Sequence, residues 1–182
     1  MNSSIRPEVL QHLIRMQALS RAGEALGESP VTASVTNSEW YKKGKIKAAR
    51  RFTREALIAE YSSEFPYVQT DRKAIIIVGP PGSGKSTTLS REVPDFERYL
   101  QIDADRFKDK ILRLAISDGT YDSYLKPAEV HHLEEKGEKF FSFDLASTVH
   151  LESAKYADRL RDDALDGEKI LLSILYLLMI GY

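Results

Sequence analysis

The chain of 182 residues contains no cysteine, and this absence excludes several kinds of chemistry. Disulfides, thiolate metal sites and cysteine nucleophiles are impossible, and only four histidines remain for imidazole chemistry. The N-terminal residues also lack the apolar run of a secretory signal. A chain without cysteine suits a reducing compartment, so we predict a cytoplasmic protein.

The chain also lacks an excess of charge of either sign. Lys and Arg number 26 against 27 for Asp and Glu, a net charge of -1. Such a balance gives no global attraction to nucleic acid or to a membrane surface, so neither is an expected partner. The most apolar segment, residues 170–180, is well short of the roughly 18 residues that span a bilayer, and we interpret it as a buried strand.

What the chain does contain is an ordinary globular composition, with 42% hydrophobic and 29% charged residues. The first part is predicted to be helical: one helix from Ser4 to Leu26 with Pro7 in its first turn, a loop over 27–38, and a second helix from Glu39 to Ser62. We interpret the lysines and arginines of the second helix as a solvated basic face, in preference to a surface that binds nucleic acid or a partner protein. We interpret residues 1–70 as a helical extension and 71–182 as the core domain.

After Pro66 the pattern changes to alternating strands and helices. Ala74–Val78 is a continuous apolar run, rich in β-branched residues and closed by Gly and Pro, which is typical of a strand buried on both faces. A second short strand is expected at Tyr99–Ile102. Helices are expected over 106–116, 127–135 and 146–165, and the alternation predicts an α/β fold with a parallel sheet.

A phosphate-binding motif directly follows the first of these strands. The motif has the pattern G-x-x-x-x-G-K-[ST] and comprises Gly79, Pro80, Pro81, Gly82, Ser83, Gly84, Lys85 and Ser86, with Thr87 next in the chain. Glycines let successive backbone N–H groups point into one concavity that holds phosphate oxygens. In this arrangement Lys85 reaches the β- and γ-phosphates and Ser86 ligates Mg²⁺, so the motif predicts ATP and Mg²⁺ as cofactors.

Two carboxylates follow the second strand. Asp103 and Asp105 lie where ligands bind in open α/β sheets, at the carboxyl ends of strands. One of them could hold Mg²⁺ directly or through water, and the other could accept a proton from an acceptor hydroxyl. The alternative for either residue is a helix N-cap. Arg106 beside them is a further candidate for contacting the substrate.

A third group, His150, Glu152 and Tyr156, is predicted to lie on a helix. His150 and Glu152 are two residues apart and so do not share a helical face, which argues against a two-ligand metal site. The favoured interpretation is an exposed helix surface, with Glu152 as a weaker substrate-binding candidate.

Taken together, the chain resembles the zeta toxin family of P-loop kinases from about Trp40 to Lys169. The resemblance rests on AIIIVGPPGSGKSTTL, on YLQIDADRFK about twenty residues later and on VHLESAKYADRL. It implies a P-loop NTPase fold, three α/β/α layers with a parallel sheet behind an N-terminal helical extension. It also implies an ATP-dependent kinase that phosphorylates a 3′-hydroxyl of UDP-N-acetylglucosamine and is restrained by a partner antitoxin. Lys85 then corresponds to the phosphate lysine and Asp105 to the carboxylate that takes the acceptor proton.

The chain departs from the family pattern near its end. Ser173 stands where the family has an acid that contacts the sugar nucleotide, and no arginine follows Arg161 to cover the transferring phosphate. Such an arginine can contribute about 10³ to 10⁵ in rate. The resemblance therefore implies a C-terminally truncated kinase. Two alternatives stay open: another small-molecule P-loop kinase, or a nucleotide-binding remnant without turnover.

Overall fold

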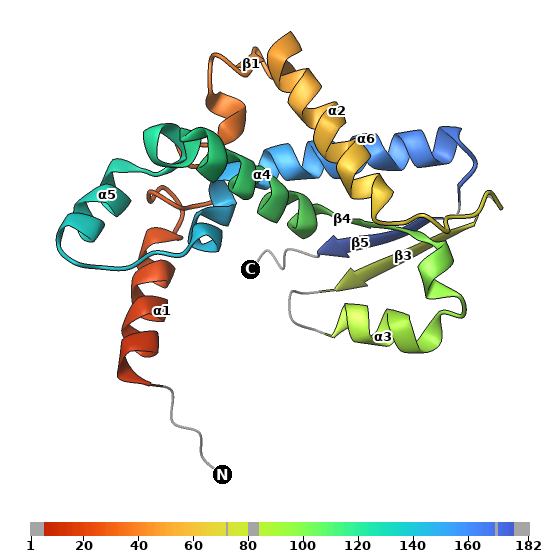
Figure 1. Ribbon diagram of the computed structural model, residues 1–182. Helices are drawn as coiled ribbons and strands as arrows, with labels where there is room; N and C mark the ends of the chain where they lie inside the picture. Colours follow the sequence, from red (N-terminus) through yellow and green to blue (C-terminus); the bar gives the residue numbers. More distant parts are fainter. Residues whose placement is uncertain (1–5, 72, 80–83, 170, 177–182) are drawn as a thin grey trace. The chain divides into compact units, whose positions relative to one another are not determined.

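The computed structural model describes residues 6–71, 73–79, 84–169 and 171–176, and it is α/β, mostly helical with a small sheet (Figure 1). By internal contacts it divides into two units. Unit 1 comprises residues 1–50 and 108–152, and unit 2 comprises residues 51–107 and 153–182. The units interleave along the chain, whereas the sequence-based division has a single boundary near residue 70.

Unit 1 is built from helices, helical turns and one short hairpin. Its elements are α1 (Pro7–Leu19), a 3₁₀ turn (Ser34–Thr36), β1 (Tyr41–Lys42), β2 (Lys45–Ile46), a π-helical turn (Tyr121–Leu125), α5 (Ala128–Glu135) and a 3₁₀ segment (Ser142–Val149). It also contains parts of α2 (Ala48–Ser63), α4 (Ala104–Asp118) and α6 (His150–Asp166). No helix in the described part of the chain is long and apolar enough to cross a membrane.

The first predicted helix forms, but it is shorter than expected. It begins at Pro7, whose fixed φ suits a first helical turn, and it ends at Leu19 instead of Leu26. Beyond it the chain turns through Gly23, which has a φ of 84°. The turn lets the Leu26 N–H donate to the Leu19 carbonyl at 2.9 Å and buries the Leu26 side chain.

The second predicted helix is wrong over its first nine residues. A hairpin replaces it there, because Lys43 and Gly44 both have positive φ, 50° and 73°, as a two-residue type I′ turn requires. Tyr41 then pairs with Ile46, and Lys42 with Lys45, in an antiparallel ladder. The helix begins only at Ala48 and ends at Ser63, close to the predicted end.

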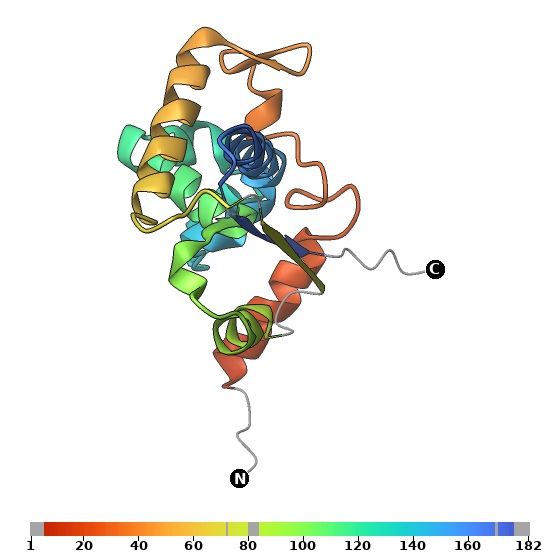
Figure 2. The ribbon, with the colours of Figure 1, turned by 90° about the vertical axis from the view of Figure 1, so that its right-hand side faces the viewer.

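Unit 2 holds a three-stranded sheet formed by β3 (Ala74–Gly79), β5 (Leu171–Tyr176) and β4 (Leu100–Asp103), in that order. Both strand pairs are parallel. The chain passes from β3 through α3 (Lys85–Glu92) and a 3₁₀ turn (Phe96–Arg98) to β4, and later through α6 to the central strand. Figures 1 and 2 show α3 and α6 on opposite faces of this sheet.

Strands form at the three predicted places, but the burial predicted for residues 170–180 lies outside what the structure describes. The run Ala74–Val78 lies in β3, the segment Tyr99–Ile102 contributes to β4, and residues 171–176 form β5, while 177–182 lie outside the described residues. The prediction that β3 is buried on both faces is wrong: Ile76 is 59% exposed. Ile75 and Ile77, whose side chains point to the opposite face from Ile76, are half-buried, so the described part of the chain covers only one face of β3.

The apolar side chains that are buried in the described part of unit 2 come mainly from α2, β4 and α6. They are Leu57, Ile58, Tyr61, Leu100, Ile102, Phe107, Tyr156, Ala157, Leu160 and Ala164. In α6 the spacing of three and four residues places the buried positions on one helical face. This packing fixes the ends of α2 and β4, which lead to the predicted site.

Candidate functional site

The predicted phosphate loop lies between a strand and a helix, as its motif requires. β3 ends at Gly79, and α3 begins at Lys85. Gly84 has a φ of 76°, a left-handed conformation that glycine adopts without the cost of a Cβ, and its carbonyl accepts the Thr88 N–H at 2.9 Å. Pro80, Pro81, Gly82 and Ser83 lie outside the described residues, as do the side chains of Lys85 and Ser86.

The two predicted carboxylates lie at the end of β4, where the chain enters α4. The Asp105 N–H donates to Oδ1 of Asp103 at 2.9 Å, so Asp103 acts as a cap for the first turn of α4. Both side chains are half-buried. Asp103 is therefore the N-cap of α4, the alternative considered for it, through one of its two carboxylate oxygens. The hydrogen bond to the Asp105 N–H fixes this carboxylate at the end of β4.

A tyrosine from α2 holds the same strand end. The Tyr61 hydroxyl donates to the Gln101 carbonyl at 2.8 Å and accepts the Asp103 N–H at 3.2 Å. Its ring is fully buried and stacks on Phe107, with ring centroids 4.4 Å apart. Burial raises the pKa of the Tyr61 hydroxyl to about 12, although the Arg106 cation acts in the opposite direction.

Arg106 is oriented by the residues at the end of α2. Its guanidinium lies over the rings of Tyr61 and Phe65, 4.9 and 5.2 Å from their centroids, and it forms an ion pair with Glu64. The Arg106 side chain is about two-fifths exposed. An acid and two rings thus hold the Arg106 guanidinium against the end of α2, and these contacts offset the entropy lost when the long side chain is ordered.

The register of the sheet relates the carboxylates to the phosphate loop. Ile174 of the central strand pairs with Ile77 on one side and with Asp103 on the other. Asp103 therefore lies two residues before the level of Gly79, and Asp105 follows it beyond the strand end. With strands about 4.8 Å apart, β3 and β4 are separated by roughly 10 Å across the sheet. Both carboxyl ends point to the same edge, where ligands of open α/β sheets bind.

The carboxylate of Asp103 is an oxygen ligand of the kind that Mg²⁺ prefers, and it lies at this edge of the sheet. The motif adds the hydroxyl of Ser86 as a candidate ligand from the sequence alone. Within the described ranges, no group of three or more His or acidic residues forms a metal cluster. Phosphate oxygens and water complete the Mg²⁺ shell at nucleotide sites, so a full set of protein ligands is not required there.

Glu152 and Tyr156 do not form the exposed helix surface that the sequence predicts, because both are fully buried. Glu152 lies in unit 1, where its carboxylate accepts hydrogen bonds from Arg50 Nε at 2.7 Å, Arg50 Nη2 at 2.8 Å and the Tyr41 hydroxyl at 3.0 Å. Arg50 in turn lies over Trp40, 4.0 Å from the ring centroid. The basic face predicted for α2 is thus wrong at Arg50, which is 5% exposed.

Sequence reasoning missed the role of Tyr61 at the end of β4, because in the sequence this residue is simply one of the apolar positions of the second predicted helix. No local signal indicates that its hydroxyl reaches a strand forty residues later.

Comparison of the chain with protein-family models, with characterised proteins and with solved structures finds no match.

Proposed function

We propose that this chain is an ATP-dependent kinase of zeta toxin type, which transfers the γ-phosphate of ATP to a hydroxyl of UDP-N-acetylglucosamine in the cytoplasm. The observation that carries the proposal is the motif G-x-x-x-x-G-K-[ST] at a strand-to-helix transition, with Gly84 in the left-handed conformation. The P-loop NTPase architecture is part of the proposal, and the parallel strands with helices on both faces support it.

The residues at the sheet edge have separate roles in this reaction. Lys85 binds the β- and γ-phosphates, with Gly79, Gly84 and the neighbouring loop supplying backbone N–H groups and Thr87 lying in the first turn of the helix. Asp105 accepts the proton of the acceptor hydroxyl. The hydroxyl oxygen forms a bond to the γ-phosphorus, the bond from that phosphorus to the β–γ bridging oxygen breaks, and ADP leaves. Arg106, the next residue in the chain after Asp105, is assigned to the acceptor in this proposal.

Magnesium belongs to the same proposal. Asp103 and Ser86 would hold Mg²⁺, which supplies charge neutralisation for the β- and γ-phosphates when bound. The capping bond from the Asp105 N–H keeps the Asp103 carboxylate at the strand end. The Tyr61 hydroxyl bonds to the Gln101 carbonyl and to the Asp103 N–H, and so fixes the backbone at the end of β4. The Asp103 carboxylate therefore does not have to be ordered when nucleotide binds.

Ligand-induced stabilisation tests nucleotide binding. The melting temperature is measured with and without Mg-ATP for the wild type, for Lys85→Ala and for Lys139→Ala, a control at an exposed lysine. Ligand at 100 times its dissociation constant adds about 2.7 kcal/mol, a shift of several degrees. We expect the shift in the wild type and the control and its loss in Lys85→Ala. Equal shifts in all three proteins would contradict the role of the loop.

Transfer is tested separately with ATP and a panel of acceptors that includes UDP-N-acetylglucosamine. A phosphorylated sugar nucleotide that requires Lys85 supports the proposal. A different phosphorylated acceptor assigns the site to another small-molecule kinase. A thermal shift with no product from any acceptor assigns it to a nucleotide-binding protein without turnover. An antitoxin partner is expected only in the first case.

A further inference from the structure

The guanidinium of Arg106 is held by one of its nitrogens and by its flat face, and it keeps hydrogen-bond donors free. The face lies over the rings of Tyr61 and Phe65, and Nη2 donates to Glu64. In the described part of the chain, Nε and Nη1 make no hydrogen bond, and 41% of the side chain is exposed. All four residues lie in unit 2. The contacts thus orient the guanidinium and leave two nitrogens to donate to a ligand.

An arginine in this state is suited to bind a phosphate group. A planar guanidinium offers two parallel N–H donors to two phosphate oxygens, and hydrogen bonds between charged groups are stronger than neutral ones. Glu64 and the two rings order the side chain before any ligand binds, so less entropy is lost on binding. Arg98 differs in this respect, because it pairs only with Asp95, at 3.7 Å, and lies over no ring in the described ranges.

The order of the strands separates this guanidinium from the phosphate loop. β3, which ends at the loop, and β4, which leads into α4 and Arg106, lie on opposite sides of β5. Two strand spacings make roughly 10 Å across the sheet. Glu64 and the rings hold Arg106 at the end of α2, and the Tyr61 hydroxyl ties α2 to β4. The phosphates of a nucleotide in the loop are assigned to Lys85, so the free donors of Arg106 are left for a second anionic group.

We propose that Arg106 determines the specificity for the acceptor by binding one of its phosphate groups, and that Glu64 positions the guanidinium. The inference rests on the proposed kinase function and names the class of its acceptor. Asp105, the proposed base, directly precedes Arg106 with Cα atoms about 3.8 Å apart, so one bound molecule can reach both residues. The acceptor is then a phosphorylated sugar or a sugar nucleotide, and an uncharged sugar with the same hydroxyl is a poor substrate.

Calorimetric titration with charged and uncharged ligands tests the inference. The charged ligands are UDP-N-acetylglucosamine and N-acetylglucosamine 1-phosphate, and the uncharged ones are uridine and N-acetylglucosamine. Mg-ADP is present in excess to occupy the phosphate loop. We expect Arg106→Gln to weaken the binding of the charged ligands by about 10- to 100-fold, as the loss of a hydrogen-bonded charge pair does. Arg98→Gln is the matched control at an ion-paired arginine that is 47% exposed, and it should bind as the wild type does.

Three outcomes would overturn the inference. They are a wild type that binds neither charged ligand, a wild type that binds the uncharged ligands equally well, and an Arg106→Gln variant with unchanged affinity. Arg106→Lys keeps the charge but lacks the planar pair of donors, so it should recover only part of the affinity. If Arg106→Gln has a lower melting temperature than the wild type, Arg106→Lys decides the question in its place.

Product assays on the same proteins separate this inference from the kinase proposal. If no protein forms a phosphorylated product but Arg106→Gln still loses affinity for the sugar nucleotide, the kinase proposal fails and Arg106 remains a phosphate-binding residue. If product forms and Arg106→Gln has the wild-type KM for the acceptor, the inference about Arg106 fails and the kinase proposal stands. A rise in KM for the acceptor, with KM for ATP unchanged, supports both.

Discussion

The guanidinium of Arg50 and the carboxylate of Glu152 form two parallel hydrogen bonds, Nε to Oε1 at 2.7 Å and Nη2 to Oε2 at 2.8 Å, across 102 residues of sequence. Both side chains are buried, and the Tyr41 hydroxyl donates a third bond to the carboxylate. A buried charge is tolerated only with its partner, so each residue depends on the other.

Removal of one member of this pair should destabilise the protein strongly. Arg50→Met leaves the Glu152 carboxylate buried without its main partner, and we expect a loss of about 3 to 5 kcal/mol in the free energy of unfolding. Urea unfolding measures it. Arg51→Met, at the exposed neighbouring position, is the control and should stay within about 0.5 kcal/mol of the wild type. If Arg50→Met unfolds like the control, the pair has no structural role. The double variant Arg50→Met/Glu152→Leu should recover most of the loss, because apolar side chains can replace a buried ion pair.

The Tyr61 hydroxyl should make stability depend on pH in the alkaline range. Burial raises its pKa from 10.0 to about 12, so the folded state favours the neutral form. Its contribution to stability is therefore complete below pH 10 and is lost as the pH rises toward 12. Urea unfolding at several alkaline pH values measures this loss.

Tyr61→Phe keeps the ring stacked on Phe107 but removes the two hydrogen bonds to β4. We expect a cost of about 1 to 3 kcal/mol at neutral pH and a shallower decline of stability at alkaline pH. The decline does not vanish, because burial also raises the pKa of Tyr121 to about 12. Tyr67→Phe changes an exposed tyrosine and should leave the alkaline curve as in the wild type. An identical curve for Tyr61→Phe would show that its hydroxyl does not hold the strand end.

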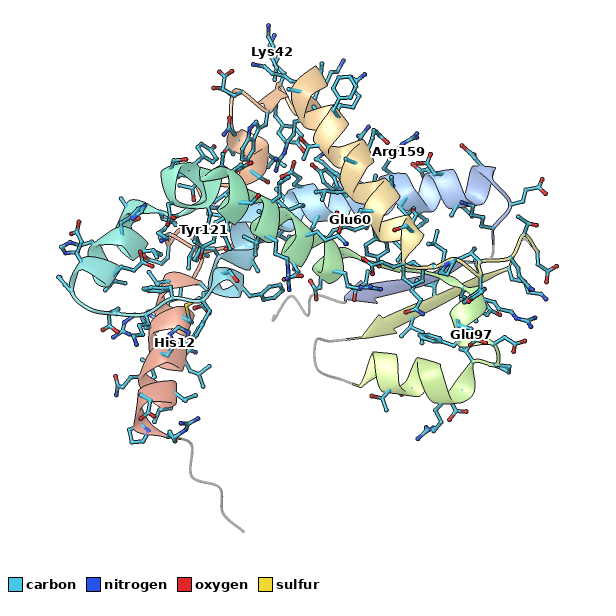
Figure 3. The ribbon with its side chains drawn as sticks, in the orientation of Figure 1. His12, Lys42, Glu60, Glu97, Tyr121 and Arg159 are labelled. Carbon is cyan, nitrogen blue, oxygen red and sulfur yellow. The ribbon has the colours of Figure 1, made fainter. Side chains whose placement is uncertain are left out.

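The hairpin carries two lysines directly opposite each other, and relief of their repulsion should stabilise it. Lys42 pairs with Lys45, and Figure 3 shows Lys42 extending away from the hairpin. Like charges in this position are unfavourable, so Lys45→Glu should add about 0.2 to 1 kcal/mol to the free energy of unfolding. The gain should shrink at high salt, and Lys45→Gln should give a smaller, less salt-sensitive gain. A gain that does not respond to salt would show that charge is not its cause.

Substitutions at Asp105 and Lys85 should differ in kind. Asp105→Asn keeps the side-chain size but cannot take up the acceptor proton, so we expect transfer to be lost while the thermal shift with Mg-ATP remains. Lys85→Ala should lose both, because the lysine binds the phosphates before and during transfer. Assays of phosphorylated product and of melting temperature on the same preparations separate the two effects. Equal losses of ATP-induced stabilisation would refute the division of roles.

The sequence could predict those parts of the fold that depend on interactions between residues close together in the chain. The β-branched run of β3, the short apolar segment of β4 and the helix from Ala128 to Glu135 carry their own periodicity, and they form where expected. The helix expected from Glu39 failed at Gly44, where a local turn with two positive φ values outweighs helix propensity. Gly44, which lies between two lysines inside the expected helix, was the local signal for a turn at this point.

The sequence by itself determined strand β3 and the G-x-x-x-x-G-K-[ST] motif that begins at its last residue, because these depend on neighbouring residues and on backbone conformations that only certain side chains permit. The tertiary structure alone decided that Glu152 is buried against Arg50, that the Tyr61 hydroxyl reaches the end of β4 and that α1 turns its aliphatic face outward. The physical reason is that burial, and the pairing of charges that burial demands, depend on which distant segments pack together.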